Sequence, residues 1–198
     1  MGKGKRTSRP KADLLISKAR RKKPPLPDLE TLHERHRGLT EAVGSAFAEA
    51  AAVCCSRHHS PPHSIRIDTP NGGALRSLKW TVPDERTRDA WANRDDATRD
   101  GAYAVSLAVV EAELKLRATA RAETRTGADY YVGTGRRRDL EKDLRLEVSG
   151  TDSVDEQEVE RRVMAKIKQT EEGDSNVPAV AAVVGFASGR VVVRKAPK

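Results

Sequence analysis

The chain is poor in aromatic residues, cysteine and long apolar runs, and each shortage excludes a class of protein. It has two Trp, three Tyr and two Phe, which leaves little material for the base-stacking platforms that bind single-stranded nucleic acid. Its two cysteines, Cys54 and Cys55, are adjacent, so no intrachain disulfide framework is expected, which fits a reducing compartment. No apolar run approaches the ~20 residues that span a membrane. Leu14, Leu15 and Ile16 make too short a run for a signal peptide, so we expect a cytoplasmic protein without a membrane partner.

The net charge of +8 is concentrated at one end of the chain. Residues 1–23 contain ten Lys or Arg and a single acid, Asp13, so they carry +9 and leave the rest of the chain near −1. A basic tail attracts phosphate through salt-dependent, sequence-independent electrostatics. It therefore predicts nucleic acid as a partner, and the alternative is a solvated, solubilising terminus.

Composition divides the chain into three parts. Residues 1–27 form a basic tail that ends in a proline-rich junction and is expected to be disordered. Residues 28–94 are predicted to form an extension with a long helix over residues 28–58, which Gly38 and Gly44 could divide into two. A small hairpin with strands at residues 64–68 and 75–80 follows, and then a short helix near Trp91.

Residues 95–198 are predicted to form an α/β core. Apolar spacing favours a helix over residues 95–123, wrapped on two sides. Strands are expected over residues 128–132 and 145–149, a helix over residues 154–170, and strands over residues 178–186 and 190–195. The unbroken Ala and Val run over residues 178–186 is typical of a central strand covered on both faces. This order gives a layered domain of about 100 residues.

Two carboxylates stand on the first two of these strands. Asp129 opens one strand, and Glu147 alternates with Leu146 and Val148 in the next. If the strands pair, both carboxylates can converge on one face of the sheet. Oxygen ligands of this kind suit Mg²⁺ or Mn²⁺, and such a metal would activate a water and stabilise charge on a phosphate.

Helical phase selects the lysine that accompanies the carboxylates. In the helix over residues 154–170, Lys166 falls beside the apolar stripe of Val159, Val163 and Ile167, whereas Lys168 falls on the opposite side. Gln169 lies at the edge of the stripe. Lys166 is therefore expected to enter the protein and reach the carboxylates, and Lys168 to point to solvent.

This arrangement resembles the restriction-endonuclease-like PD-(D/E)xK nuclease superfamily, and narrower segments resemble a little-characterised bacterial branch of it. The matching positions are Glu111 in the first helix, Asp129, and the segment Glu147-Val148-Ser149. The resemblance covers roughly residues 95–198 and implies a core of helix, mixed sheet, helix and strands. Ser149 stands where the superfamily pattern has lysine. Some branches move that lysine to the following helix, which would make Lys166 the replacement.

The resemblance implies a Mg²⁺-dependent nuclease acting in defence or DNA processing. Asp129 and Glu147 would hold Mg²⁺ or Mn²⁺, with Lys166 as electrostatic helper and Glu111 as an auxiliary acid. Nucleic acid would also contact Gln169 and the loop residues Arg136, Arg137 and Arg138, which lie between the two acidic strands. The alternatives are a non-catalytic nucleic-acid-binding module on the same fold, and a protein-interaction subunit whose helix at residues 28–58 packs on a partner. The partners considered include another protein and a second copy of the chain.

Each candidate residue also has a structural interpretation. Glu111 could form a surface salt bridge with Lys115, and Asp129 could satisfy backbone groups at the opening of its strand. Glu147 could lie on an exposed face of the sheet, and Lys166 could extend along the edge of its helix. The three loop arginines could form a soluble tip neutralised by the acids that follow them in the sequence.

A zinc site is not expected. Cys54 and His58, and Cys55 and His59, are spaced as helical pairs, but the two pairs lie on faces about 100° apart. A closed tetrahedral site needs four ligands from one direction. Buried cysteines and helix-terminal histidines, with His63 beyond them, are the expected arrangement.

Overall fold

The computed structural model describes residues 24–135, 139, 142–173 and 175–197. Most of the predicted tail, and Arg136, Arg137 and Arg138, lie outside the described residues. The inner end of that tail is part of the fold, because Leu26 is 7% exposed and its N–H donates to the carbonyl of Ser77.

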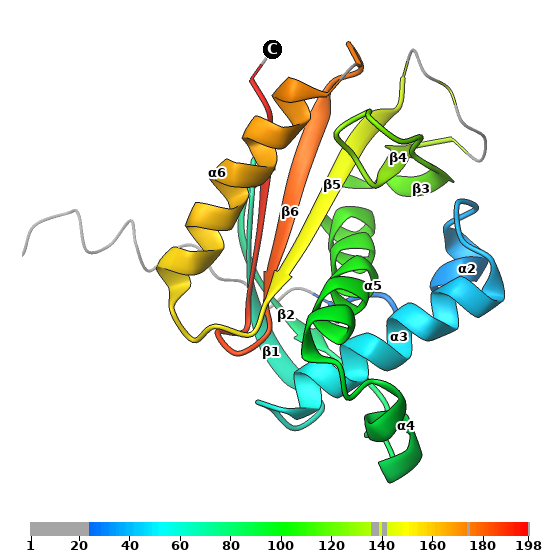
Figure 1. Ribbon diagram of the computed structural model, residues 1–198, viewed down its shortest axis with the longest axis vertical. Coiled ribbons are helices and arrows are strands. Elements are labelled where there is room, and N and C mark those ends of the chain that lie inside the picture. The colour runs from blue at the N-terminus through cyan, green and yellow to red at the C-terminus, as the bar shows by residue number, and fades with distance from the viewer. Residues whose placement is uncertain (1–23, 136–138, 140–141, 174, 198) are drawn as a thin grey trace, which may run out of the picture.

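The described part of the chain is an α/β structure built on a seven-stranded mixed sheet (Figure 1). The strand order is β2-β1-β7-β6-β5-β4-β3. The β1–β7 and β6–β5 pairs are parallel, and the other neighbours are antiparallel. The strands are β1 (His63–Thr69), β2 (Gly72–Leu78), β3 (Arg117–Arg121), β4 (Tyr130–Gly133), β5 (Leu144–Thr151), β6 (Ala179–Gly185) and β7 (Arg190–Lys195).

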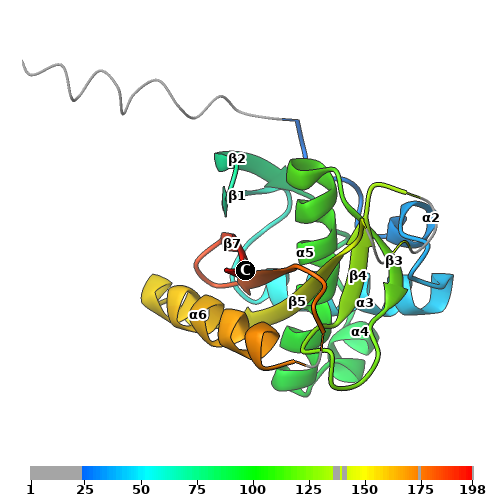
Figure 2. The same ribbon diagram turned by 90° about the horizontal axis from the view of Figure 1, so that it is seen from above.

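Helices cover both faces of this sheet. They are α2 (Leu32–Arg35), α3 (Glu41–Ser56), α4 (Glu85–Ala90), α5 (Arg94–Leu114) and α6 (Glu156–Glu172). The two views place α6 on one face, across β6 and β7, and α5 with α3 on the other (Figures 1 and 2). Because β6 is covered on both sides, all seven of its residues are buried, as its apolar sequence predicts.

Each face has its own apolar core. Val159, Val163 and Ile167 of α6 pack against Ala181, Val183 and Val192. The larger core on the opposite face joins α3 and α5 to the alternate residues of the same strands. The hairpin of β1 and β2 belongs to this larger core and extends the same sheet through the pairing of β1 with β7. Residues 28–94 and 95–198 therefore share one core.

The helix predicted over residues 95–123 ends at Leu114, and the prediction beyond that point is wrong. Lys115 adopts a left-handed conformation with φ 61° and its N–H bonds to the carbonyl of Val110, which stops the helix. Leu116 leads into β3, where Ala118 pairs with Val132 of β4. Of the apolar residues that continue the helical pattern, Ala118 is buried within β3, and Leu116, just before the strand, is partly buried.

The helix predicted over residues 28–58 is two helices, α2 and α3. Gly38 separates them, because its N–H donates to the carbonyl of Ala118 and a Cβ there would lie only 3.0 Å from the backbone nitrogen of Ala120. Thr40 then caps α3 by accepting the N–H of Val43. The buried face of α3 packs on α5.

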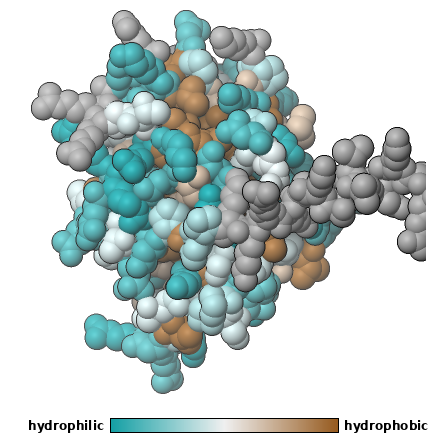
Figure 3. Space-filling model, turned by 180° about the vertical axis from the view of Figure 1, so that it is seen from behind, coloured by the Kyte–Doolittle hydropathy of each residue, from teal (hydrophilic) through white to brown (hydrophobic). Residues whose placement is uncertain are grey.

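One face of the molecule is mostly polar. Seen from behind, hydrophilic residues cover most of the face, and hydrophobic ones gather in small patches among them (Figure 3). Among the helices that the structure describes, none combines the length and apolarity that crossing a membrane requires.

Candidate functional site

Asp129 lies where β4 begins to pair with β5, and both of its carboxylate oxygens have partners. Oδ2 accepts the N–H of Val148 at 2.8 Å, and Oδ1 accepts the hydroxyl of Tyr103 at 2.6 Å. The first bond joins the side chain to the β5 backbone, and the second joins it to α5. Asp129 is therefore held between the sheet and a helix. Its bond with the Val148 N–H is also the kind of backbone contact expected of an acid at the opening of a strand.

Glu147 lies on the α6 face of β5, with its side chain only 4% exposed. The register that pairs Tyr130 with Leu146 places Asp129 opposite Glu147. Burial raises the pKa of Glu147 to about 7, and the charge of Asp129 and a hydrogen bond with it act in the same direction, whereas Lys166 opposes the rise. The two carboxyl groups therefore converge, as the sequence predicts, and share a site in which full ionisation is costly.

Lys166 brings a positive charge to this pair. Its ammonium donates to Oε1 of Glu147 at 2.6 Å and to Oε1 of Gln169 at 2.9 Å. Lys168 lies 75% exposed and pairs with Glu172 on the surface of the same helix. The choice of Lys166 by helical phase agrees with this geometry.

The three side chains line an open polar cavity of about 710 Å³ between α5, β5 and α6. Ser149 and Gln169 also line it. Three arginines reach the cavity from its two helical walls: Arg94, Arg99 and Arg162. A cavity of this size can admit an extended anionic ligand beside the carboxylates.

The donor set fits a small hard cation in part. Mg²⁺ binds through one or two carboxylates and keeps several waters, and Asp129 and Glu147 supply that number. Among the described residues, no group of three or more His, Cys, Asp or Glu side chains is arranged to hold a metal. The remaining ligands of a bound Mg²⁺ would therefore be waters or substrate oxygens.

The structure separates Glu111 from this site. Glu111 follows Tyr103 by eight residues on α5, about 12 Å along the helix axis. Its carboxylate accepts from Arg35 at 2.9 Å, contacts His36 Nε2 at 3.2 Å, and lies 3.3 Å from Arg117. Burial opposes its ionisation, but the hydrogen bonds with His36 and Arg35 outweigh burial and lower its pKa to about 2. Glu111, expected as an auxiliary acid, therefore links the α2 region to α5. Its contacts with Arg35, His36 and Arg117 take the place of the salt bridge with Lys115 that its spacing suggests.

Arg121 is a neighbour of the site that the sequence did not single out. Its guanidinium lies over the rings of Tyr103 and Tyr130, 4.8 and 4.7 Å from their centroids, and 3.5 Å from Oδ1 of Asp129. Burial and the charge of Asp129 raise the pKa of the Tyr103 hydroxyl, so it remains a donor to Asp129. The sequence pattern places Arg121 in the helix expected over residues 95–123, so it gives no sign that Arg121 lies in β3 near Asp129.

A second ionic cluster surrounds Asp152, which also lines this cavity. Asp152 accepts from Arg57 at 2.9 Å and from Arg94 at 3.2 Å, and contacts His58 at 3.3 Å. His59 stacks on His63 with ring centroids 3.8 Å apart. Burial raises the pKa of both cysteine thiols. Among the residues that the structure describes, these histidines and cysteines do not gather into a group of three or more that could hold a metal.

Comparison with known proteins gives no relative from which a function could be carried over. The chain matches no protein-family model, no curated protein and no solved structure. The case for function therefore rests on the residues themselves.

Proposed function

We propose that this protein is a Mg²⁺- or Mn²⁺-dependent nuclease that hydrolyses phosphodiester bonds at Asp129, Glu147 and Lys166. The observation that carries the proposal is the 2.6 Å contact between Lys166 and Glu147, beside Asp129, in an open polar cavity. Two carboxylates and an ammonium at one point combine ligands for a hard cation with a charge that stabilises an anionic phosphate.

Each of the three residues would have a role that its position in the site determines. Asp129, fixed by Tyr103 and the Val148 N–H, would hold the metal together with Glu147. A bound Mg²⁺ would supply a water of lowered pKa and charge stabilisation on phosphate oxygens. Lys166 would orient Glu147 and present its one remaining N–H donor to the substrate phosphate.

The order of elements supports the finer fold assignment, a restriction-endonuclease-like core. From α5 onward the chain runs helix, three strands, helix and two strands, which agrees with the order implied by the resemblance. Lys166 on α6 reaches the position beside Glu147 that the superfamily fills from the strand, where this chain has Ser149. This contact supports the interpretation of Lys166 as the displaced lysine.

The test is cleavage of plasmid DNA and of RNA by the purified full chain with Mg²⁺ or Mn²⁺. Asp129→Asn and Glu147→Gln should each abolish metal-dependent cleavage while the far-ultraviolet circular dichroism stays unchanged. Glu172→Gln is the matched control, because this carboxylate lies exposed on α6 and pairs with Lys168. Cleavage that persists in Asp129→Asn would show that the site assignment is wrong.

The second candidate is a non-catalytic nucleic-acid-binding module. Two observations favour such a module: this chain has Ser149 where the superfamily has lysine, and arginines line the cavity. It predicts salt-dependent DNA affinity without cleavage. That affinity should survive Glu147→Ala and fall when the cations of residues 1–23 are replaced by Gln.

A further inference from the structure

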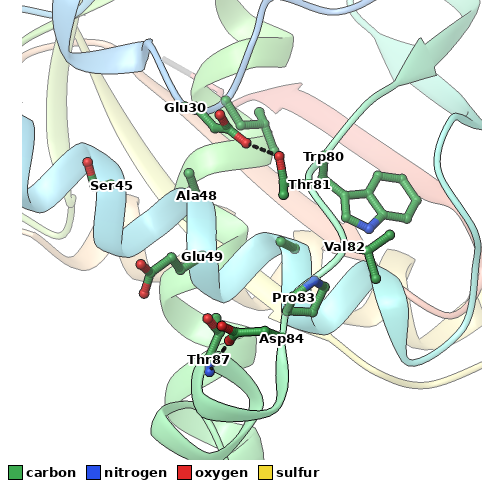
Figure 4. Close-up of a pocket in the computed structure, with 12 residues that line it drawn as sticks. Glu30, Ser45, Ala48, Glu49, Trp80, Thr81, Val82, Pro83, Asp84 and Thr87 are labelled. Atoms are coloured by element: carbon green, nitrogen blue, oxygen red, sulfur yellow. Dashed lines mark hydrogen bonds between the residues drawn. The ribbon is translucent and has the colours of Figure 1, made fainter.

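A second cavity, of about 480 Å³, shares no lining residue with the site of Asp129 and Glu147. It lies between α3, residues 80–84 and the first turn of α4 (Figure 4). Leu29, Ala48, Ala52, Trp80 and Pro83 give it an apolar floor. Val82 at its side is 56% exposed, which is a large fraction for an apolar side chain. The cavity therefore offers apolar surface that a ligand could cover.

The polar part of this cavity is acidic. Among the described residues, its lining includes Glu30, Glu49 and Asp84 and no Lys or Arg. Figure 4 shows the three carboxylates on different elements, with Glu30 near Thr81, Glu49 on α3 and Asp84 beside Thr87. Thr81 and Thr87 form hydrogen bonds with Glu30 and Asp84, which fixes those two acids at the rim. An occupant should therefore combine apolar side chains with cations on either side of them.

One segment of this chain has that composition. Residues 11–18 read Lys-Ala-Asp-Leu-Leu-Ile-Ser-Lys. Leu14, Leu15 and Ile16 match the apolar floor, and Lys11 and Lys18 match the acids at the rim.

The attachment point of the tail makes this contact reachable. Leu26 is anchored to Ser77 of β2, and Leu29, three residues later, already lines the cavity. The ten residues from Ile16 to Leu26 can span up to about 33 Å, and the three from Leu26 to Leu29 at most about 10 Å. A tether of this kind gives an effective local concentration of about millimolar, so even a weak contact would be populated.

We propose that residues 11–18 dock within their own chain into this acidic, apolar-floored cavity. The docking is independent of the proposed nuclease activity. Docking would pair Lys11 and Lys18 with carboxylates of the same molecule. Less of the tail's positive charge would then be available to bind other anions.

Zero-length carbodiimide cross-linking of the full chain, followed by peptide mass spectrometry, tests the contact directly. Lys11 or Lys18 should become linked to Glu30, Glu49 or Asp84 in the monomer. The double variant Leu14→Asp, Leu15→Asp removes the apolar side chains that would fill the cavity and leaves the described core unchanged, so it should abolish these links. Val82→Asp replaces an apolar side chain on the exposed side of the cavity and should also abolish them. Lys3→Gln with Lys5→Gln is the matched control, because it lowers the tail's charge and leaves residues 11–18 intact.

Hydrogen exchange provides a second readout. The amides of residues 80–87 should exchange faster in the Leu14→Asp, Leu15→Asp protein than in the parent or the control. The proposal is overturned if the links spread over acids elsewhere on the surface, or if the leucine variant leaves both links and exchange unchanged. Links found only between isotopically different chains in a mixed sample would identify a second copy as the occupant, and would also overturn docking within one chain.

Discussion

Lys166 and Glu147 are joined by a 2.6 Å contact between α6 and β5, two elements that follow one another in the chain. The ammonium of Lys166 partly compensates the charge of Glu147. The pKa of this buried carboxylate lies near 7 because of burial and the proximity of Asp129. Removing either partner leaves the other charge poorly compensated, which makes the pair a sensitive place to test function and stability separately.

Lys166→Met should reduce any metal-dependent cleavage by about a hundredfold or more, because an ammonium directed at a charged site typically contributes on that scale. It should also raise the pKa of Glu147, since the lysine opposes the effect of burial. Carboxyl ¹³C shifts during a pH titration measure this second effect. Lys168→Met, on the exposed side of the same helix, should change neither quantity. An unchanged Glu147 titration in Lys166→Met would contradict the contact.

The stability of the parent protein should depend on the ionisation of Glu147 between pH 4.5 and pH 7. Its pKa is raised in the folded state, so the folded chain holds a proton that the unfolded chain has already released. This contribution to stability is therefore present at low pH and is lost as pH rises through about 7, by up to about 2–3 kcal/mol. Glu147→Gln should remove this part of the pH dependence in urea titrations at pH 5 and pH 8. If Mg²⁺ binds the carboxylates, adding it at pH 8 should stabilise the parent but not the variant.

Glu111→Gln should destabilise the protein by about 2–3 kcal/mol, because it weakens hydrogen bonds between a buried carboxylate and charged partners. The pKa of Glu111 is lowered to about 2, so its contribution is present above pH 4.5 and is lost as pH falls toward 2. Urea titration of the parent and variant at pH 7 and pH 3 measures the difference, which should shrink at the lower pH. Cleavage per folded molecule should be unchanged, and a loss of activity without a loss of stability would restore Glu111 to the site.

Tyr103→Phe should weaken the positioning of Asp129, because it removes the donor that lies 2.6 Å from Oδ1. We expect a loss of about 1–2 kcal/mol in unfolding free energy and a weaker apparent affinity for the activating metal. Arg121→Lys keeps the charge but not the planar contact with the two rings, and should give a smaller effect of the same sign. Phe47→Leu, which alters an apolar neighbour of the Tyr103 ring, controls for packing. Metal titration of cleavage and of thermal stability distinguishes positioning from packing.

The sequence predicts the central part of this fold because its patterns are local. The apolar run of β6 and the stripe of α6 need no distant partner to be recognised, and the stripe also selects Lys166 over Lys168. The end of α5 was missed because it depends on the left-handed conformation of Lys115 and on pairing of β3 with β4. The partners of Glu111 were missed because Arg35 and His36 lie more than seventy residues earlier in the chain.

The N-terminal segment between Leu26 and Gly38 has a consequence for any shortened form of the protein. Leu26 bonds to β2 and Gly38 bonds to β3, which are the two outermost strands of the sheet. Exposed outer strands are templates on which further chains can add. A truncation that stops before residue 24 should remain monodisperse, whereas one that removes residues 24–38 would uncover both borders and favour concentration-dependent aggregation. Light scattering of the two truncated forms would show that this short stretch protects the solubility of the whole domain.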